Sequence, residues 1–512
     1  DQHYIAVKVD QDARPDLSRR YENYGWPATI VFGPDGREIV KRRGYIPPAR
    51  FAALLQAILD DPSPVRYADS EPVTAFSQSP LLAQDIRRTL SKQFVATHDF
   101  RVGGLDQQQK FMDRDSVEYA LMLAMRGDEK ARAMALQTLD GSLNLIDPAW
   151  GGAYQYSTHR DWQHPHFEKI MFIQAEHVRL YSLAYQALGD ERFLQAARAV
   201  DRYVTRFLLS PDGAFYVSQD ADLIKGQHSE DYFSLPDEQR LKLGIPAIDK
   251  HLYSRENGWM IHAQIFLYAA TGDEAVLARA LTAARWVLNN RALPGGGFRH
   301  DAVDPAGPYL EDTLAMGRAF LGLYQVTGER EWLQHAEAAA RFIGAKFALG
   351  DAGFVTSVAG GVLDPLPQTD ENIMLARFAN LLSRYTGSAQ YRKDAERAMR
   401  YLVTRQVALR RITEAGILIA DIELSSDPAH FTVVGRKDDV QARALFLAAQ
   451  RYRGGYKRIE WWDRREGAMP NPDIQYPVLE QAAAFVCTDG SCSLPQFKAK
   501  ELLAIAERLE TR

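Results

Sequence analysis

The sequence predicts a multidomain protein, combining α/β and all-α parts, in which an incomplete α/β domain is followed by a closed α/α toroid and a small C-terminal α/β element. The chain has 512 residues, which is too long for one small module at roughly 150 residues per domain. Hydrophobic periodicity changes along the chain from strand-like to helical and back to strand-like. Within the helical part, a glycine followed by an acidic residue recurs between consecutive helices.

Composition excludes several classes of partner. Apolar residues make up 46% and charged residues 25% of the chain, as in folded, soluble proteins. The formal charge of −5 argues against a surface that binds nucleic acid or anionic membranes. No apolar run approaches the roughly 20 residues of a membrane span. We therefore expect neither nucleic acid nor a membrane as a partner. The expected location is a bacterial cytoplasm or periplasm, with the choice between them open.

The first unit, residues 1–60, alternates strand and helix signals. The predicted elements are a strand at Tyr4–Asp10, a helix at Arg14–Tyr24, strands at Ala28–Phe32 and Glu38–Arg43, and a helix at Ala49–Leu59. This order, with Gly25-Trp26-Pro27 before the second strand and a Pro-Asp-Gly turn after it, resembles the second half of a thioredoxin fold. The resemblance implies a cis bond before Pro27 and a missing N-terminal part with its Cys-x-x-Cys motif. A generic α/β fragment is the alternative.

Residues 61–84 are rich in Pro, Ser and Asp and predict a linker. The helical domain follows over residues 85–425. Its helices end and restart at boundaries such as Gly189-Asp190, Gly272-Asp273 and Gly328-Glu329. Because these boundaries are irregularly spaced, they favour a closed toroid with long loops over an open solenoid. In a toroid, the long loops gather on one face and surround a pocket.

Residues 426–512 predict the small C-terminal α/β element that closes the toroid. The predicted segments are a strand at Phe431–Gly435, a helix at Asp439–Tyr452, a strand at Lys457–Trp461 and a strand-like stretch at Ala482–Cys487.

The long loops carry polar residues to the points just before the predicted inner helices. The string His164-Pro165-His166-Phe167-Glu168-Lys169 is the densest, and we predict His166, Glu168 and Asp220 as acid–base residues. The predicted ligand-binding residues are Lys169, Asp222, Asp249, Lys250, Asn257, Glu311 and Asp312. We expect His166, Glu168, Asp220, Asn257, Glu311 and Asp312 to line one pocket, although acidic residues and Asn at helix starts also serve as caps. Metal-ligand spacing is weak, so we expect no metal and no cofactor.

Several of these strings, in this order, resemble the thioredoxin-domain proteins related to spermatogenesis-associated protein 20. The residues that carry the resemblance include Gly25-Trp26-Pro27, Pro165-His166-Phe167-Glu168-Lys169, Gln219-Asp220-Ala221-Asp222, Leu310-Glu311-Asp312 and Cys487 with Cys492. The resemblance implies a thioredoxin-like domain fused to an (α/α)6 toroid of the six-hairpin glycosidase type, similar to N-acylglucosamine 2-epimerases. Two departures are the missing cysteine motif and the segment Leu223–Leu235, which differs from the family pattern.

The resemblance favours an enzyme that acts on a small-molecule sugar in the toroid pocket. The chemistry is either proton abstraction next to a carbonyl, as in epimerases and isomerases, or hydrolysis by two carboxylates. The alternative is a redox or folding-assistance protein whose toroid binds a protein client or thiol partner. That function needs a dithiol, and Cys487 and Cys492 are the only cysteines. They can equally form a structural pair.

Overall fold

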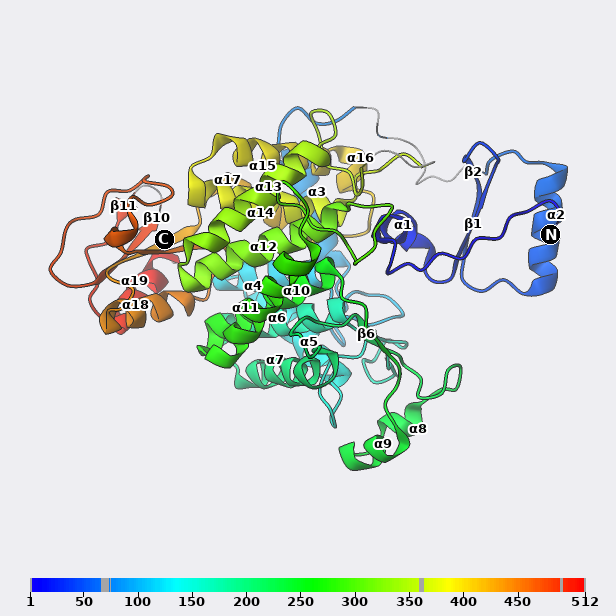
Figure 1. Ribbon diagram of the computed structural model, residues 1–512, viewed down its shortest axis with the longest axis horizontal. Helices are drawn as coiled ribbons and strands as arrows, with labels where there is room; N and C mark the ends of the chain where they lie inside the picture. The colour runs from blue at the N-terminus through cyan, green and yellow to red at the C-terminus, as the bar shows by residue number, and fades with distance from the viewer. Residues whose placement is uncertain (1, 66–72, 74, 359–362, 489–490, 511–512) are drawn as a thin grey trace.

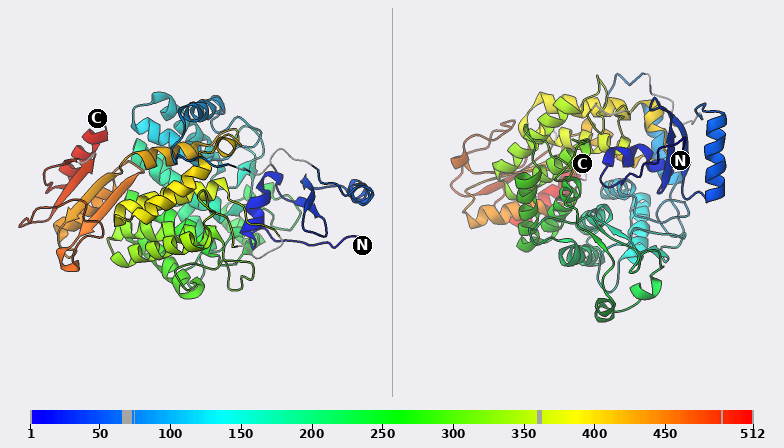
Figure 2. Two further views of the ribbon diagram at one scale, coloured as in Figure 1. Left: turned by 90° about the horizontal axis from the view of Figure 1, so that it is seen from above. Right: turned by 45° about the vertical axis from the view of Figure 1, so that its right-hand side comes forward.

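The computed structural model describes residues 2–65, 73, 75–358, 363–488 and 491–510. The chain forms an N-terminal unit, a large helical domain and a C-terminal α/β unit, which follow one another along the long axis of the molecule (Figure 1). The views in Figure 2 show the same order, with the N-terminal and C-terminal units at opposite ends of the helical domain. None of the described helices has the length and apolar character needed to cross a membrane.

The N-terminal unit contains one hairpin and two α-helices around a small core. Its elements are α1 (Pro15–Tyr21), β1 (Ala28–Phe32), β2 (Glu38–Arg43) and α2 (Pro48–Asp60), with β1 and β2 antiparallel. The Trp26–Pro27 bond is cis, as predicted. The strand predicted at Tyr4–Asp10 is wrong, because no described strand pairs with this extended segment. Alternation alone cannot make a strand without a partner for its backbone groups.

Within the described residues, six inner helices form a closed ring: α4 (Arg114–Met125), α6 (Met171–Leu188), α10 (Ser254–Thr271), α12 (Leu310–Thr327), α14 (Thr369–Thr386) and α17 (Ala415–Ser425). Each helix packs on the next in this order, and α17 packs back on α4. The outer layer consists of α3 (Gln84–Ala96), α5 (Glu129–Ser142), α7 (Glu191–Tyr203), α11 (Glu274–Arg291), α13 (Arg330–Lys346) and α15 (Ala389–Leu402). The predicted (α/α)6 toroid is confirmed.

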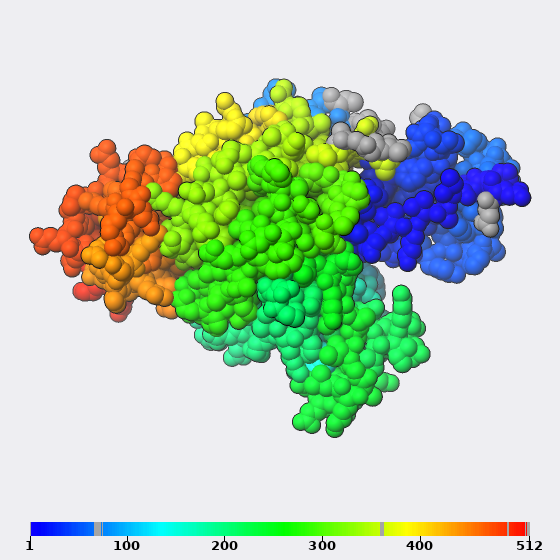
Figure 3. Space-filling view, in the orientation of Figure 1, coloured from blue at the N-terminus to red at the C-terminus, as the bar shows by residue number. Residues whose placement is uncertain are grey.

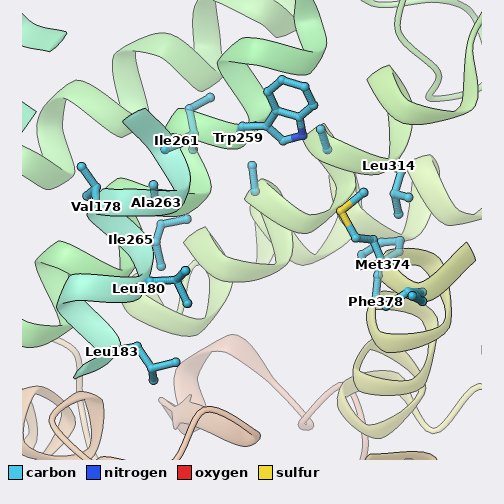
Figure 4. Packing of buried hydrophobic residues seen from close by; sticks show 14 of the residues in the cluster. Val178, Leu180, Leu183, Trp259, Ile261, Ala263, Ile265, Leu314, Met374 and Phe378 are labelled. Atoms are coloured by element: carbon cyan, nitrogen blue, oxygen red, sulfur yellow. The ribbon is translucent and has the colours of Figure 1, made fainter. Parts of the chain in front are cut away.

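Short glycine turns connect most inner helices to their outer partners. Helices α6, α10, α12 and α14 end at glycines with φ of 72°, 72°, 70° and 69°, a conformation that suits glycine. Asp190 and Asp273 then cap the following outer helices with their side chains. Between the helices, aliphatic and aromatic side chains such as Leu180, Ile265, Leu314 and Phe378 form a continuous core (Figure 4).

The inner helices begin earlier than predicted. Glu256, Asn257, Glu311 and Asp312 lie in the first turns of α10 and α12, although we expected them in the preceding loops. The reason is that a first helical turn accommodates acidic residues well, since the helix dipole favours negative charge there. A run of polar residues therefore does not by itself mark a loop.

The C-terminal unit covers the end of the toroid opposite the N-terminal unit. Its elements are β8 (Ala429–Val434), α18 (Val440–Gln450), β9 (Lys457–Trp462), β10 (Ala483–Thr488), β11 (Ser491–Cys492) and α19 (Ala499–Glu510). The strand order is β11–β10–β8–β9, with β8 and β9 parallel. Strand β9 packs on α12 and α14. The linker predicted at residues 61–84 includes residues 66–72 and 74, which lie outside the described residues.

Candidate active site

All inner helices run in the same direction, because an outer helix returns the chain between successive members of the ring. Their N-terminal ends therefore meet at one end of the toroid, which we call the mouth, and they enclose a space that we call the lumen. Helix α1 of the N-terminal unit lies over the mouth, where Arg19 reaches Glu311 in the first turn of α12. Figure 3 shows the N-terminal unit seated against the helical domain.

Polar contacts hold the N-terminal unit on the mouth, including an ion pair, a bridging arginine and a histidine bond. The guanidinium of Arg19 donates to both carboxylate oxygens of Glu311, at 2.8 and 3.3 Å. Arg411 bridges Glu22 of the N-terminal unit and Asp370 of α14, at 2.6 and 2.7 Å. The third contact joins the His300 ring to the Asp12 carbonyl, at 2.7 Å. The N-terminal unit thus supplies charged groups to the mouth as well as covering it.

The carboxyl groups at the mouth differ in their affinity for protons. Burial opposes ionisation of Glu311, but the neighbouring Arg19 and Arg255 outweigh it and lower the pKa of this carboxyl. Burial, reinforced by the charge of Glu311, raises the pKa of Glu371 well above its ordinary value. Within the described chain, Glu371 Oε2 is buried without a hydrogen-bond partner. An ionised carboxylate beside a protonated one is an arrangement that supports acid–base chemistry.

Deeper in the lumen, charged side chains bridge neighbouring inner helices and, in one case, two helices that are not neighbours in the ring. Arg377 of α14 donates to Glu118 of α4 and to Glu423 of α17. Arg179 of α6 donates to the other oxygen of Glu118 at 2.7 Å and also pairs with Glu176. Since α4 and α14 are separated by α17 in the ring, the contact between Arg377 and Glu118 crosses the lumen.

The inner helices combine charge with aromatic surface near the mouth. The side chains of Arg114, Asp115, Glu176 and Arg377 are 11–19% exposed, so solvent reaches these charged groups. Aromatic residues line the same space and contact these charges. Phe172 and Trp259 meet edge to face at 5.1 Å, Arg114 lies 5.3 Å over the Phe172 ring, and Arg255 lies 4.8 Å over the Trp259 ring.

A separate cavity of about 290 Å³ lies between the toroid and the C-terminal unit. Met122 and Met125 of α4, Phe431 of β8 and the Gly454–Tyr456 loop contribute to its walls. Glu118 and Glu423 also line it, so the charged layer of the lumen borders this cavity.

Of the predicted acid–base residues, His166 and Glu168 lie just before α6, in a short strand and shortly after it, and Asp220 lies directly after a strand that follows α7. His166 Nε2 is 3.7 Å from Glu168 Oε2, with 39% and 35% of the side chains exposed. Lys169 in β5 (Lys169–Ile170) pairs antiparallel with Gln219 in β6 (Ser218–Gln219). Glu168 and Asp220 therefore lie at the same end of this ladder, and strand alternation puts both on the face opposite the buried Lys169 and Gln219.

Strand β7 (Ile248–Asp249) adds a third carboxylate to that face, because Asp249 pairs with Ser218. Asp249 also contacts His251 at 2.5 Å. The carboxylate of Asp220 accepts from the Asp222 backbone and that of Asp222 from the Gly226 backbone, while Lys250 is exposed.

Three predicted ligand-binding residues are instead buried with partners of their own. Lys169 contacts Asp147 at 2.7 Å within a cluster of aromatic rings. Asn257 bonds the backbone N–H and C=O of Phe215. Asp312 accepts from the Arg255 backbone and pairs with His300 at 2.9 Å. These side chains turn into the protein interior, so they do not join Glu168 and Asp220 in one pocket and we do not assign them to ligand binding.

The predicted redox pair is present as a disulfide. Cys487 of β10 and Cys492 of β11 are bonded across the edge of the C-terminal sheet, with Cys487 buried and Cys492 exposed. Residues 489–490, between the two cysteines, lie outside the described residues. In the described part of the chain, no group of three or more His, Cys, Asp or Glu is placed to hold a metal ion.

Sequence reasoning missed the charged residues of the lumen, such as Arg318, Arg377 and Glu118. A signal was available, because Arg318 follows Glu311 by seven residues and Arg377 follows Asp370 by the same interval. That spacing places both members of a pair on one face of a helix. Charged pairs at this interval on helices with apolar flanks indicate a polar channel inside the ring.

Comparison with known proteins finds relatives by sequence and by structure. No family model matches the chain. Spermatogenesis-associated protein 20 of Mus musculus is 28% identical over 256 residues, which is 43% of this chain and 32% of that protein. An uncharacterised protein of Caenorhabditis elegans is 23% identical over 437 residues, which is 72% of this chain and 59% of that protein. The matches thus span less than two thirds of the length of these relatives.

Solved structures with a similar arrangement include a sugar epimerase from a ruminal bacterium and cellobiose 2-epimerase from Bacillus thermoamylovorans. The first has a TM-score of 0.47 and 16% identity, covering 62% of this chain and 85% of that one. The second has a TM-score of 0.48 and 14% identity, covering 62% and 86%. The chain is therefore a sequence relative of spermatogenesis-associated protein 20 over part of its length, with a closed (α/α)6 toroid as its central domain.

Proposed function

We propose that the chain binds a sugar or sugar derivative through the mouth and lumen of the toroid and acts on it by acid–base chemistry. The observation that carries this proposal is the mouth cluster, in which Glu311, bonded by Arg19, lies near Glu371, whose buried Oε2 has no hydrogen-bond partner among the described residues. Carboxylates and guanidinium groups match a ligand rich in hydroxyls, since they accept and donate hydrogen bonds. Trp259 and Phe172 offer aromatic surface for the apolar face of a sugar ring.

His166, Glu168 and Asp220 are the proposed acid–base residues at the rim of the mouth. In an epimerase or isomerase, a base removes the proton from the carbon next to the carbonyl and an acid protonates the carbonyl oxygen. The return of a proton to carbon completes the reaction. In a hydrolase, the acid instead protonates the leaving oxygen while the second carboxylate either activates a water that attacks the anomeric carbon or attacks that carbon itself, after which water releases the sugar. His166 and Glu168 lie 3.7 Å apart, close enough for both side chains to reach one bound sugar.

The test uses the purified chain with a panel of aldoses and ketoses in D2O, and with a panel of glycosides. Proton NMR would detect deuterium at the carbon next to the carbonyl, and a reducing-end assay would detect hydrolysis. We expect His166→Asn and Glu168→Gln to lose about 10²–10⁴-fold in rate. His164→Asn is the matched control, because His164 is 52% exposed and belongs to the same string. Absence of both reactions, or full rates in the His166 and Glu168 variants, would overturn this assignment.

A second candidate function is thiol–disulfide exchange at Cys487 and Cys492. It is supported by the disulfide itself, because Cys492 lies on an exposed edge strand where a thiolate could approach. This function would leave the lumen as a binding surface for a client.

A further inference from the structure

Arg318 is a lumen arginine that forms no ion pair with any residue in the described part of the chain. It lies on α12 seven residues after Glu311, which places it about 10 Å deeper along the same helix face at about 1.5 Å per residue. Among the described residues, its one hydrogen-bond acceptor is the sulfur of Met374, at 3.2 Å from Nη1. A thioether is a weak acceptor, so most of the five N–H groups of this partly exposed guanidinium have no strong acceptor in the described protein.

The carboxylates that lie near Arg318 in the lumen are bonded to other arginines. Glu118 accepts from both Arg179 and Arg377, Glu176 from Arg179, and Glu423 from Arg377. Burial, followed by repulsion from Arg179 and Arg377, lowers the pKa of Arg318 to about 10. The guanidinium therefore remains charged at neutral pH in a place that disfavours its charge.

His262 of α10 faces the same layer. Burial and then the charge of Arg318 lower the pKa of His262 well below its ordinary value. Its ring is therefore neutral near pH 7, with one nitrogen able to donate and the other able to accept a hydrogen bond. The layer thus presents a cation with unused donors next to a neutral polar ring, with Trp259 one turn closer to the mouth on α10.

We infer that the ligand of the lumen carries an anionic group, a carboxylate or a phosphate, that binds Arg318. Arg318 is partly exposed, so a ligand can reach its guanidinium, and an anion with paired oxygens would satisfy both the charge and the fork of donors. This inference rests on the proposed function and specifies its ligand as an acidic or phosphorylated sugar. The anionic group lies deep in the lumen, and the rest of the sugar extends toward Glu311 and Glu371.

The inference is tested by calorimetric titration of the full chain with glucose, glucuronate, glucose 6-phosphate and inorganic phosphate at constant ionic strength. We expect at least one of the two acidic sugars to bind more tightly than glucose. In Arg318→Met that sugar should lose about ten- to hundredfold in affinity, the range expected for hydrogen bonds between charged groups. Arg318→Lys should restore part of the loss. Glucuronate tests whether the lumen binds a carboxylate, and glucose 6-phosphate tests whether it binds a phosphate. Inorganic phosphate tests whether the anion alone is sufficient for binding.

The control is Arg285→Met, because Arg285 lies on an outer helix with 57% of its side chain exposed. Melting of the ligand-free proteins gives a second readout. Since Arg318 lacks a counter-ion, Arg318→Met should melt at the same temperature as the parent chain or higher. A large decrease, or equal affinity of parent and variant for the acidic sugars, would overturn the inference.

If the parent chain binds glucose as tightly as both acidic sugars, the inference fails while the proposed function stands. If the parent chain binds none of the sugars, both fail.

Discussion

Asn257 and Asn372 hold equivalent loops of the toroid in place with the same two side-chain groups. Asn257 Oδ1 accepts from the Phe215 N–H at 2.8 Å, and its Nδ2 donates to the Phe215 carbonyl at 3.1 Å. Asn372 makes the same pair of bonds with Phe354, both at 2.9 Å. Each asparagine thus fixes a loop that leads toward the mouth. This structural role explains why an Asn lies near the start of an inner helix, and no ligand is needed to account for it.

We predict that Asn257→Ala and Asn372→Ala each lower the free energy of unfolding by several kcal/mol, because two buried backbone groups lose their partners at about 1–3 kcal/mol each. Thermal melting followed by circular dichroism measures the loss. Asn290→Ala is the control, since exposed Asn290 bonds only within its own helix among the described residues. Melting of both variants close to that of the control would show that these bonds do not stabilise the loops.

His300 makes the stability of the mouth depend on pH. Burial opposes the charge on this ring, but Asp312 at 2.9 Å outweighs it and raises the pKa of His300 to about 9. Since this value exceeds the unfolded value of about 6.5, the stabilisation is complete below about pH 6.5 and is lost as the pH rises toward 9. The difference in melting temperature between the parent chain and His300→Asn should shrink over that interval. A difference that is constant from pH 6 to pH 9 would contradict the pairing.

At the scale of elements, the predictions succeeded where local signals suffice. The hairpin Ala28–Phe32 and Glu38–Arg43 was predicted to the residue, because alternation and a Pro-Asp-Gly turn define both strands. The charged lumen was not predicted, because Arg377 and Glu118 come from helices far apart in sequence that meet only after the ring closes. The roles of His166, Glu168 and Asp220 stay predictions.

Helix α1 is the element that links the N-terminal unit to the mouth, through Arg19. We predict that Arg19→Ala speeds amide hydrogen exchange in residues 14–22 by about tenfold or more, because a charge-assisted bidentate contact contributes about 1.5–3 kcal/mol. Hydrogen exchange with mass spectrometry measures this change. Arg37→Ala is the control, since the contact of Arg37 with Asp35 is largely exposed. Equal exchange in both variants would mean that Arg19 does not hold α1 on the mouth.

At the scale of the whole molecule, strands β10 and β11, which carry the disulfide, and helix α1, which covers the mouth, lie on opposite sides of the helical domain (Figure 1). We predict that reduction and alkylation of Cys487 and Cys492 leave any sugar-dependent activity unchanged. Intact mass spectrometry would confirm the reaction, and Cys487→Ser with Cys492→Ser would serve as the permanently reduced form. Loss of the sugar reaction on reduction would instead show that the disulfide and the mouth are coupled, and it would favour the redox function.

The closure of the ring has a consequence for biosynthesis. Helix α17 completes the toroid by packing on α3 and α4, which lie at the opposite end of the helical domain in sequence. During vectorial synthesis, the earlier hairpins can stack as they emerge, but α4 has no neighbour on one side until α17 leaves the ribosome. The cross-lumen bonds of Glu118 also wait for Arg377 of α14. A nascent chain that stops before α17 therefore exposes apolar surface of α4, and we expect it to depend on chaperones until the last inner helix is made.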